Sequence, residues 1–163
     1  MQTNALFYKM QREIVSTEDY VNWAHNLLEN DVSSPSVNIL SSFSFSESIF
    51  EVEVYVKRAL YELAIQKPNF EICARAYISH LANKIIKEDI PSVTFDLAYM
   101  IFRIVSSDLH YPDDLTEWYE ISEMIDVIRY GDTPLECNED EVISRIKNEA
   151  NIVLGGGCCK VVE

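Results

Sequence analysis

Apolar residues recur every three or four positions along most of the chain, which is the period of an amphipathic α-helix. Residues 46–63 carry one such stripe, made of Ile49, Val52, Val56, Ala59, Leu60 and Leu63. Residues 70–89 carry another, made of Phe70, Ala74, Tyr77, Ile78, Leu81, Ile85 and Ile86. Residues 91–105 are apolar nearly all round, which predicts the most buried helix of the protein.

Residues that start helices stand where the stripes begin. Ser16 precedes the first turn of one stripe, Ser34 comes directly before Pro35, and Asn138 is followed by three acids. Such small polar side chains accept hydrogen bonds from the first backbone amides of a helix, and proline suits its first turn. With an initial helix near residues 5–15 and another at residues 115–128, we expect seven or eight helices joined by short turns.

The sequence therefore predicts an all-α protein, either a single-domain multi-helix bundle or a short stack of helix pairs. Its 4 glycines and 5 prolines are too few for a β-sandwich or barrel, which needs many tight turns. Because no linker separates two halves, residues 1–154 are predicted to form one helical domain. The glycines at 155–157 predict a helix stop, and residues 155–163 a flexible tail.

Motifs for catalysis or cofactor binding are missing from the sequence. It contains no G-x-S-x-G, P-loop, G-x-G-x-x-G or C-x-x-C pattern. His110 is the one imidazole beside several carboxylates, those of Asp108, Asp113 and Asp114, so an enzyme centred there is an alternative. We expect instead a turn in which His110 or Asp113 caps the next helix, and we predict no catalytic residue, no metal and no cofactor.

The negative charge is concentrated in one segment of the chain. The net charge is −14, and residues 108–141 hold twelve acids and one base, Arg129. This charge repels nucleic acid and anionic lipid and attracts basic proteins. No basic stripe suits nucleic acid, no apolar run is long enough to span a bilayer, and charges interrupt the N-terminus where a signal peptide is apolar. These features predict a cytoplasmic protein with a basic protein partner.

The acidic segment also carries aromatic residues. Its spacings predict a row of acids on one helix face, with Trp118 turned to the core and Tyr119 and Tyr130 exposed. Aromatic side chains beside a charged rim are typical of tight protein interfaces, whereas ligands along one helix face do not wrap a metal ion. The alternative is a solvated face. The predicted partner-binding residues are Asp113, Asp114, Glu117, Tyr119, Glu120, Glu123, Asp126 and Tyr130.

Four stretches between residues 20 and 132 carry a resemblance to known proteins: "YVNWAHNLLEN", "SSPSVNILSSF", "FEVEVYVKRALYEL" and "DLHYPDDLTEWYEISEMIDVIRYGD". Their pattern of apolar and turn residues resembles a group of small helical bacterial proteins. Some of these look like the immunity proteins encoded beside polymorphic toxins. The resemblance implies a cytoplasmic, non-enzymatic binder of a toxin domain, and it carries no defined site residues.

Together these features predict an acidic binding protein that neutralises a basic, nuclease-type toxin domain by occluding its active-site cleft. The alternative is a helical adaptor or scaffold that binds a peptide in a groove between helices. Exposed aromatic residues beside the acids favour the first function, and exposed aromatic residues in an inter-helix groove favour the second. The oligomeric state is left open.

Overall fold

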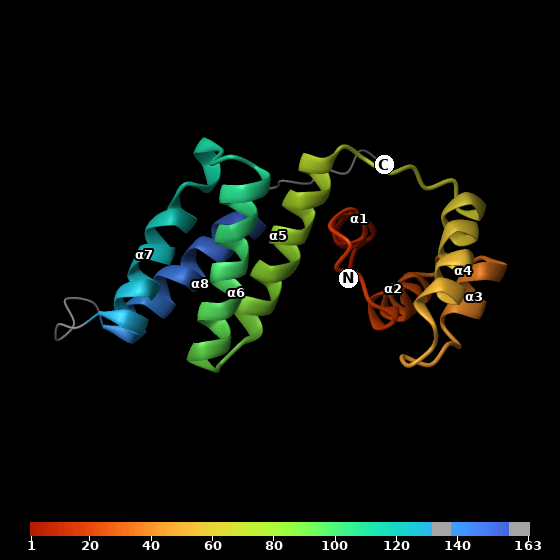
Figure 1. Ribbon diagram of the computed structural model, residues 1–163, viewed down its shortest axis with the longest axis horizontal. Coiled ribbons are helices and arrows are strands. Elements are labelled where there is room, and N and C mark those ends of the chain that lie inside the picture. Colours follow the sequence, from red (N-terminus) through yellow and green to blue (C-terminus); the bar gives the residue numbers. More distant parts are fainter. Residues whose placement is uncertain (132–137, 157–163) are drawn as a thin grey trace. The chain divides into compact units, whose positions relative to one another are not determined.

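The computed structural model describes residues 1–131 and 138–156. Within these ranges the chain forms eight α-helices, one π-helical turn and one 3-10 turn, and no strand (Figure 1). The all-α prediction and the predicted number of helices are thereby confirmed. The chain divides into two compact units, Met1–Cys73 and Ala74–Glu163. The single domain over residues 1–154 stays a prediction, and residues 157–163 of the expected tail lie outside the described residues.

The first unit is built from four helices around one apolar core. They are α1 (Thr3–Gln11), α2 (Thr17–Glu29), α3 (Pro35–Leu40) and α4 (Ile49–Glu62). Of the predicted stripe in residues 46–63, Val52, Val56 and Ala59 are fully buried, whereas Ile49, Leu60 and Leu63 are only partly buried. Tyr20, Trp23 and Ala24 of α2 complete this part of the core. Helix α4 begins three residues later than the expected start at residue 46, because the Glu47 amide donates to the Ser44 carbonyl in a turn (3.0 Å).

Side-chain caps fix the starts of α2 and α3, as the sequence predicts. The Ser16 hydroxyl accepts from the Asp19 amide, and the Asp19 carboxylate accepts from the Ser16 amide, which completes a capping box. The Asp19 carboxylate also receives a hydrogen bond from Lys9 of α1, so the cap ties two helices together. Ser34 caps the amide of Val37 at the start of α3.

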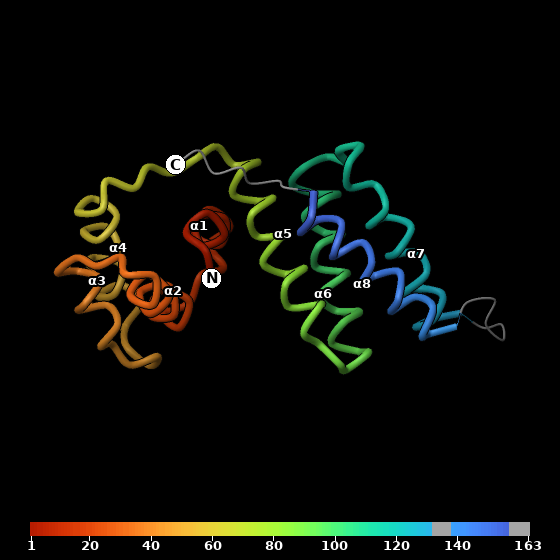
Figure 2. Tube along the Cα trace, turned by 180° about the vertical axis from the view of Figure 1, so that it is seen from behind, coloured from red at the N-terminus to blue at the C-terminus, as the bar shows by residue number. Residues whose placement is uncertain are grey.

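The second unit contains most of α5 and the remaining helices. These elements are α5 (Phe70–Lys87), which begins in the first unit, α6 (Pro91–Arg103), the π-turn η1 (Ile104–Asp108), the 3-10 turn η2 (Asp113–Leu115), α7 (Glu117–Tyr130) and α8 (Glu139–Gly155). Helix α6 packs against both α7 and α8, and α7 packs against α8 (Figure 2). The side chain of Asn138 caps the amide of Asp140 at the start of α8, as predicted.

The expectation that residues 91–105 form the most buried helix is wrong. Helix α6 buries Thr94, Phe95, Ala98 and Ile101, whereas twice as many residues of α5 are buried. Val93 and Met100 of α6 are 37% and 40% exposed, so part of the apolar surface of this helix faces solvent. The apolar content of a segment was thus not sufficient to predict which helix is the most buried.

Of the helices in the described ranges, none combines the length and the apolar content that crossing a membrane requires.

Candidate protein-binding face on the acidic helix

Helix α7 is held to the second unit by one fully buried face. Trp118, Ile121 and Ile125 are 0% exposed, and Ser122 beside them is also buried. The prediction that Trp118 is a core residue is confirmed. Because these residues fix the rotation of the helix, the side chains on its opposite face must point to solvent.

The segment before α7 reverses the chain through an unusual backbone. After the π-turn η1, His110 and Tyr111 both adopt left-handed conformations, with φ of 56° and 58°. The Tyr111 amide donates to the carbonyl of Val105 (2.9 Å), which closes the end of the preceding helix. A left-handed residue with a side chain costs about 1–2 kcal/mol, so two in succession are a strained arrangement. This turn places the Tyr111 ring beside α7.

The expected cap at the start of the acidic helix is wrong. Asp113 lies in the turn η2, before α7 begins, and neither it nor His110 caps the helix with its side chain. Thr116 occupies the cap position with helical backbone angles, and its hydroxyl donates to the Asp113 carbonyl (3.1 Å). The acid at 113 is therefore not on one continuous helix face with those at 117, 120 and 123.

Three of the acidic segment's ion pairs tie it to neighbouring helices. The guanidinium of Arg75 on α5 binds both carboxylate oxygens of Asp114, at 2.6 and 3.1 Å. These hydrogen bonds outweigh partial burial and hold the pKa of Asp114 below its usual value. Glu117 pairs with Arg145 of α8 at 2.5 Å, and Arg129 pairs with Asp96 of α6 at 2.6 Å. Asp114 and Glu117 therefore hold the unit together and are not unpaired docking charges.

Glu149 of α8 interacts electrostatically with Arg145 on the same helix. It is only 7% exposed. Burial, and then the charge of Glu117, raise the pKa of Glu149, although Arg145 opposes the effect. Arg145 thus faces two carboxylates, and its Nε donates a hydrogen bond to Glu117.

Four of the remaining predicted residues lie on what we call the α7 outer face. It comprises Tyr119, Glu120, Glu123 and Tyr130, together with Val127 between the last two. Tyr119 is 41% and Tyr130 76% exposed, which confirms that both are surface residues. Within the described part of the chain, Glu120 and Glu123 form no ion pair, and neither do Asp113 and Asp126 at the edges of this face. Its charge is therefore not neutralised from within.

A series of ring contacts supports one end of the α7 outer face. Tyr99 and Phe102 of α6 are 5.6 Å apart between ring centroids, Phe102 and Tyr119 are 6.2 Å apart, and Tyr119 and Tyr111 are 6.3 Å apart at nearly a right angle. Tyr111, Tyr99 and Phe102 were not assigned to the site from the sequence. The tertiary contact between α6 and α7 that joins them leaves no local signal.

Beside these rings lies a hollow of about 340 Å³, which we call the tyrosine hollow. It is lined by Tyr111, Thr116, Glu117, Tyr119 and Glu120. Two tyrosine rings at a steep angle with carboxylates at the rim suit a cationic side chain, because ring faces and carboxylates both attract positive charge. Of the predicted site residues, Glu117, Tyr119 and Glu120 meet here.

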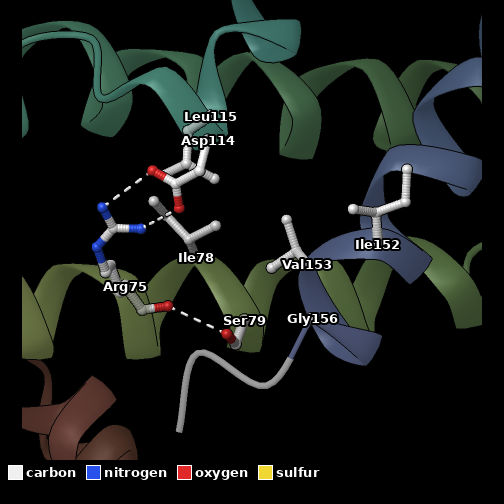
Figure 3. Close-up of a pocket in the computed structure, with 8 residues that line it drawn as sticks. All are labelled: Arg75, Ile78, Ser79, Asp114, Leu115, Ile152, Val153 and Gly156. Atoms are coloured by element: carbon white, nitrogen blue, oxygen red, sulfur yellow. Dashed lines mark hydrogen bonds and ion pairs between the residues drawn. The ribbon is translucent and has the colours of Figure 1, made fainter.

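A second hollow, the α5–α8 pocket, has a volume of about 330 Å³ and an apolar interior (Figure 3). Ile78 of α5, Leu115 of η2 and Val153 of α8 supply apolar walls, and the Arg75–Asp114 ion pair lies at one side. Among the described residues, none of those that line this pocket is aromatic.

His110 is exposed, and Asp114, one of the acids predicted to lie near it, is bound to Arg75. Among residues 1–131 and 138–156, no three His, Cys, Asp or Glu side chains lie close enough to hold a metal ion.

Comparisons with protein-family models, with curated proteins and with solved structures found no match for this chain.

Proposed function

We propose that this chain is a non-enzymatic binding protein that docks its α7 outer face onto a basic surface of another protein. The observation that carries the proposal is the tyrosine hollow beside the unpaired carboxylates of Glu120 and Glu123. Arginine or lysine of the partner inserts between Tyr111 and Tyr119, and the carboxylates neutralise its charge. Exposed aromatic residues lie beside the acids and not in the α5–α8 pocket, which favours this function over a groove binder.

The electrostatic part of the interaction acts mainly before contact. An acidic surface attracts a basic partner over about a Debye length, which is about 10 Å at 0.1 M salt, and raises the association rate. The tyrosine rings act after contact, since aromatic residues in desolvated pockets slow dissociation. Binding should therefore weaken with salt mainly through the association rate.

As the finer form of this proposal, the chain is a cytoplasmic immunity protein that occludes the cleft of a nuclease-type toxin domain. A nuclease binds phosphates through a basic cleft, and a compact acidic face can occupy the same surface. The resemblance to immunity proteins of polymorphic toxins and the acidic segment support it.

The binding proposal can be tested with an N-acetylated hexa-arginine peptide, labelled for fluorescence anisotropy. The double variant Glu120→Gln, Glu123→Gln should weaken binding about 5- to 30-fold, since each exposed charge pair contributes about 0.5–1 kcal/mol. The matched control is Glu18→Gln, Glu29→Gln, which changes the net charge equally on two exposed acids of α2. Equal weakening by both double variants would mean that the peptide follows net charge and not the α7 outer face.

The immunity form is tested in cells that produce a toxin domain encoded beside this gene. Co-production of the chain should restore growth, and the charge-reversed variant Glu120→Lys, Glu123→Lys should not. Full protection by the reversed variant would exclude the α7 outer face as the neutralising surface.

The α5–α8 pocket supports a second candidate, an adaptor that binds an apolar peptide side chain between helices. Val153→Phe fills this pocket and leaves Glu120 and Glu123 unchanged. If a captured partner is lost with Val153→Phe and retained with Glu120→Gln, Glu123→Gln, the adaptor is the correct function; the reverse result supports the acidic docking face.

A further inference from the structure

Helix α4 of the first unit presents an apolar ridge to solvent. Phe50 is 80% exposed, Val54 46% and Tyr61 88%. They are spaced by four and seven residues, so they lie in one line along about three turns. Exposed aromatic side chains that line up on one helix mark an interaction surface and not scattered surface residues. We call this line the α4 ridge.

The charges beside the ridge are arranged in a particular order. Glu53 and Lys57, one turn apart, lie along one side, and Glu51 and Arg58, two turns apart, lie along the other. Both acids are in the first half of the helix and both bases in the second. None of the four forms an ion pair with another described residue.

Two of these charged side chains, Glu53 and Arg58, make local contacts that leave their charges unneutralised. Glu53 accepts a hydrogen bond from the Tyr20 hydroxyl (3.4 Å), and the guanidinium of Arg58 lies 5.4 Å from the Tyr55 ring centroid. Glu51 and Lys57 are exposed. The ridge is therefore flanked by charges that remain available to a second protein.

We propose that α4 pairs with α4 of a second copy of this chain, antiparallel, about a two-fold axis at the level of Tyr55. In a two-fold interface, residue i faces residue j and j faces i. The axis sets Phe50 opposite Tyr61 of the second copy, and Val54 near its own counterpart. The two aromatic ends of the ridge then cover each other.

The same axis makes the charges complementary. Glu53 faces Lys57 of the second copy on one side, and Glu51 faces Arg58 on the other, so each pair forms twice. A parallel arrangement would instead set acids against acids and bases against bases, which is unfavourable. The order of charges thus selects a second copy, antiparallel, as the occupant of the ridge. This inference does not depend on the function proposed for α7.

The first test is sedimentation equilibrium of the full chain with reductant present, which keeps its 4 cysteines as thiols. We expect a dimer of twice the 18.8 kDa chain mass. The double variant Phe50→Ala, Tyr61→Ala should dimerise at least about 30-fold more weakly, as truncation of interface aromatic residues does. The control Tyr130→Ala removes an equally exposed aromatic residue from α7 and should leave the dimer unchanged.

The second test uses charge reversal and mixing. The variant Glu51→Lys, Glu53→Lys has only bases beside the ridge, and Lys57→Glu, Arg58→Glu has only acids. Each should be monomeric alone, and an equimolar mixture should form a heterodimer. Circular dichroism of each variant verifies that it is folded.

Three results would overturn the proposal. The first is a wild-type chain that stays monomeric at 100 µM or above. The second is a dimer that survives Phe50→Ala, Tyr61→Ala. The third is a pair of folded, monomeric charge variants whose mixture stays monomeric.

Discussion

Tyr119 joins the proposed docking face to the helices beneath it, so its replacement should affect both binding and folding. Its ring contacts Phe102 and Tyr111, with centroids 6.2 and 6.3 Å away. An aromatic pair contributes about 0.5–1.5 kcal/mol, so Tyr119→Ala should lower the free energy of unfolding by about 1–3 kcal/mol. The loss of a cation–π contact of about 1 kcal/mol should also weaken hexa-arginine binding by about fivefold or more.

Tyr119→Phe is the matched variant, because it retains the ring and removes only the hydroxyl. It should bind the peptide within about twofold of the wild type, since the attraction to a cation comes from the ring face. Urea unfolding followed by circular dichroism gives the stability, and fluorescence anisotropy gives the affinity. The reasoning would be refuted if Tyr119→Ala, still folded at the assay temperature, bound the peptide as tightly as Tyr119→Phe.

Four further predictions concern stability measured by urea unfolding. Burial raises the pKa of Asp19, but hydrogen bonds from Lys9 and Ser16 outweigh it and hold the pKa below 3.8. Asp19→Asn should therefore lower the free energy of unfolding by about 1–2 kcal/mol at pH 7. This loss should shrink as the pH falls below 3.8, and an unchanged loss at pH 2 would contradict the prediction. The raised pKa of Glu149 is a penalty that grows as pH rises above 4.5, so Glu149→Gln should stabilise the chain by about 1 kcal/mol at pH 7 and have no effect at pH 3. His110→Gly relieves a left-handed backbone and should stabilise by about 0.5–1 kcal/mol, whereas His110→Ala should not; equal effects would refute the strain. Trp23 donates its indole N–H to Thr3, whereas the buried Trp118 N–H has no acceptor among the described residues. Trp23→Phe should therefore lower the free energy of unfolding by about 1 kcal/mol more than Trp118→Phe, and the opposite order would contradict this.

Local features of the structure followed from the sequence because their causes are local. The caps at Ser16, Ser34 and Asn138 depend on residues two or three positions away, and each is present in the structure. The buried face of α7 at Trp118 and Ile121 follows from helical spacing alone. The period of the sequence was thus sufficient to predict that these helices exist and that Trp118 and Ile121 are buried.

Features that depend on distant residues could not be predicted in this way. Arg75 is 39 positions from Asp114 and Arg145 is 28 from Glu117, so no spacing rule reveals that two of the predicted docking acids are already paired. The position of Tyr111 depends on a π-turn and two left-handed residues, none of which has a glycine or another sequence signal. The candidate site therefore contains fewer of the predicted residues and is centred on Tyr111, Tyr119 and Glu120.

The central claim, that the α7 outer face binds basic protein surfaces, is tested most directly by mapping where a cationic probe binds. The measurement is an NMR titration of the isotope-labelled chain with the hexa-arginine peptide at low salt. We expect the largest amide shifts at Tyr111, Tyr119, Glu120 and Glu123, and we expect them to disappear in the variant Glu120→Gln, Glu123→Gln. Shifts spread over the exposed acids of both units, or concentrated away from α7, would contradict it.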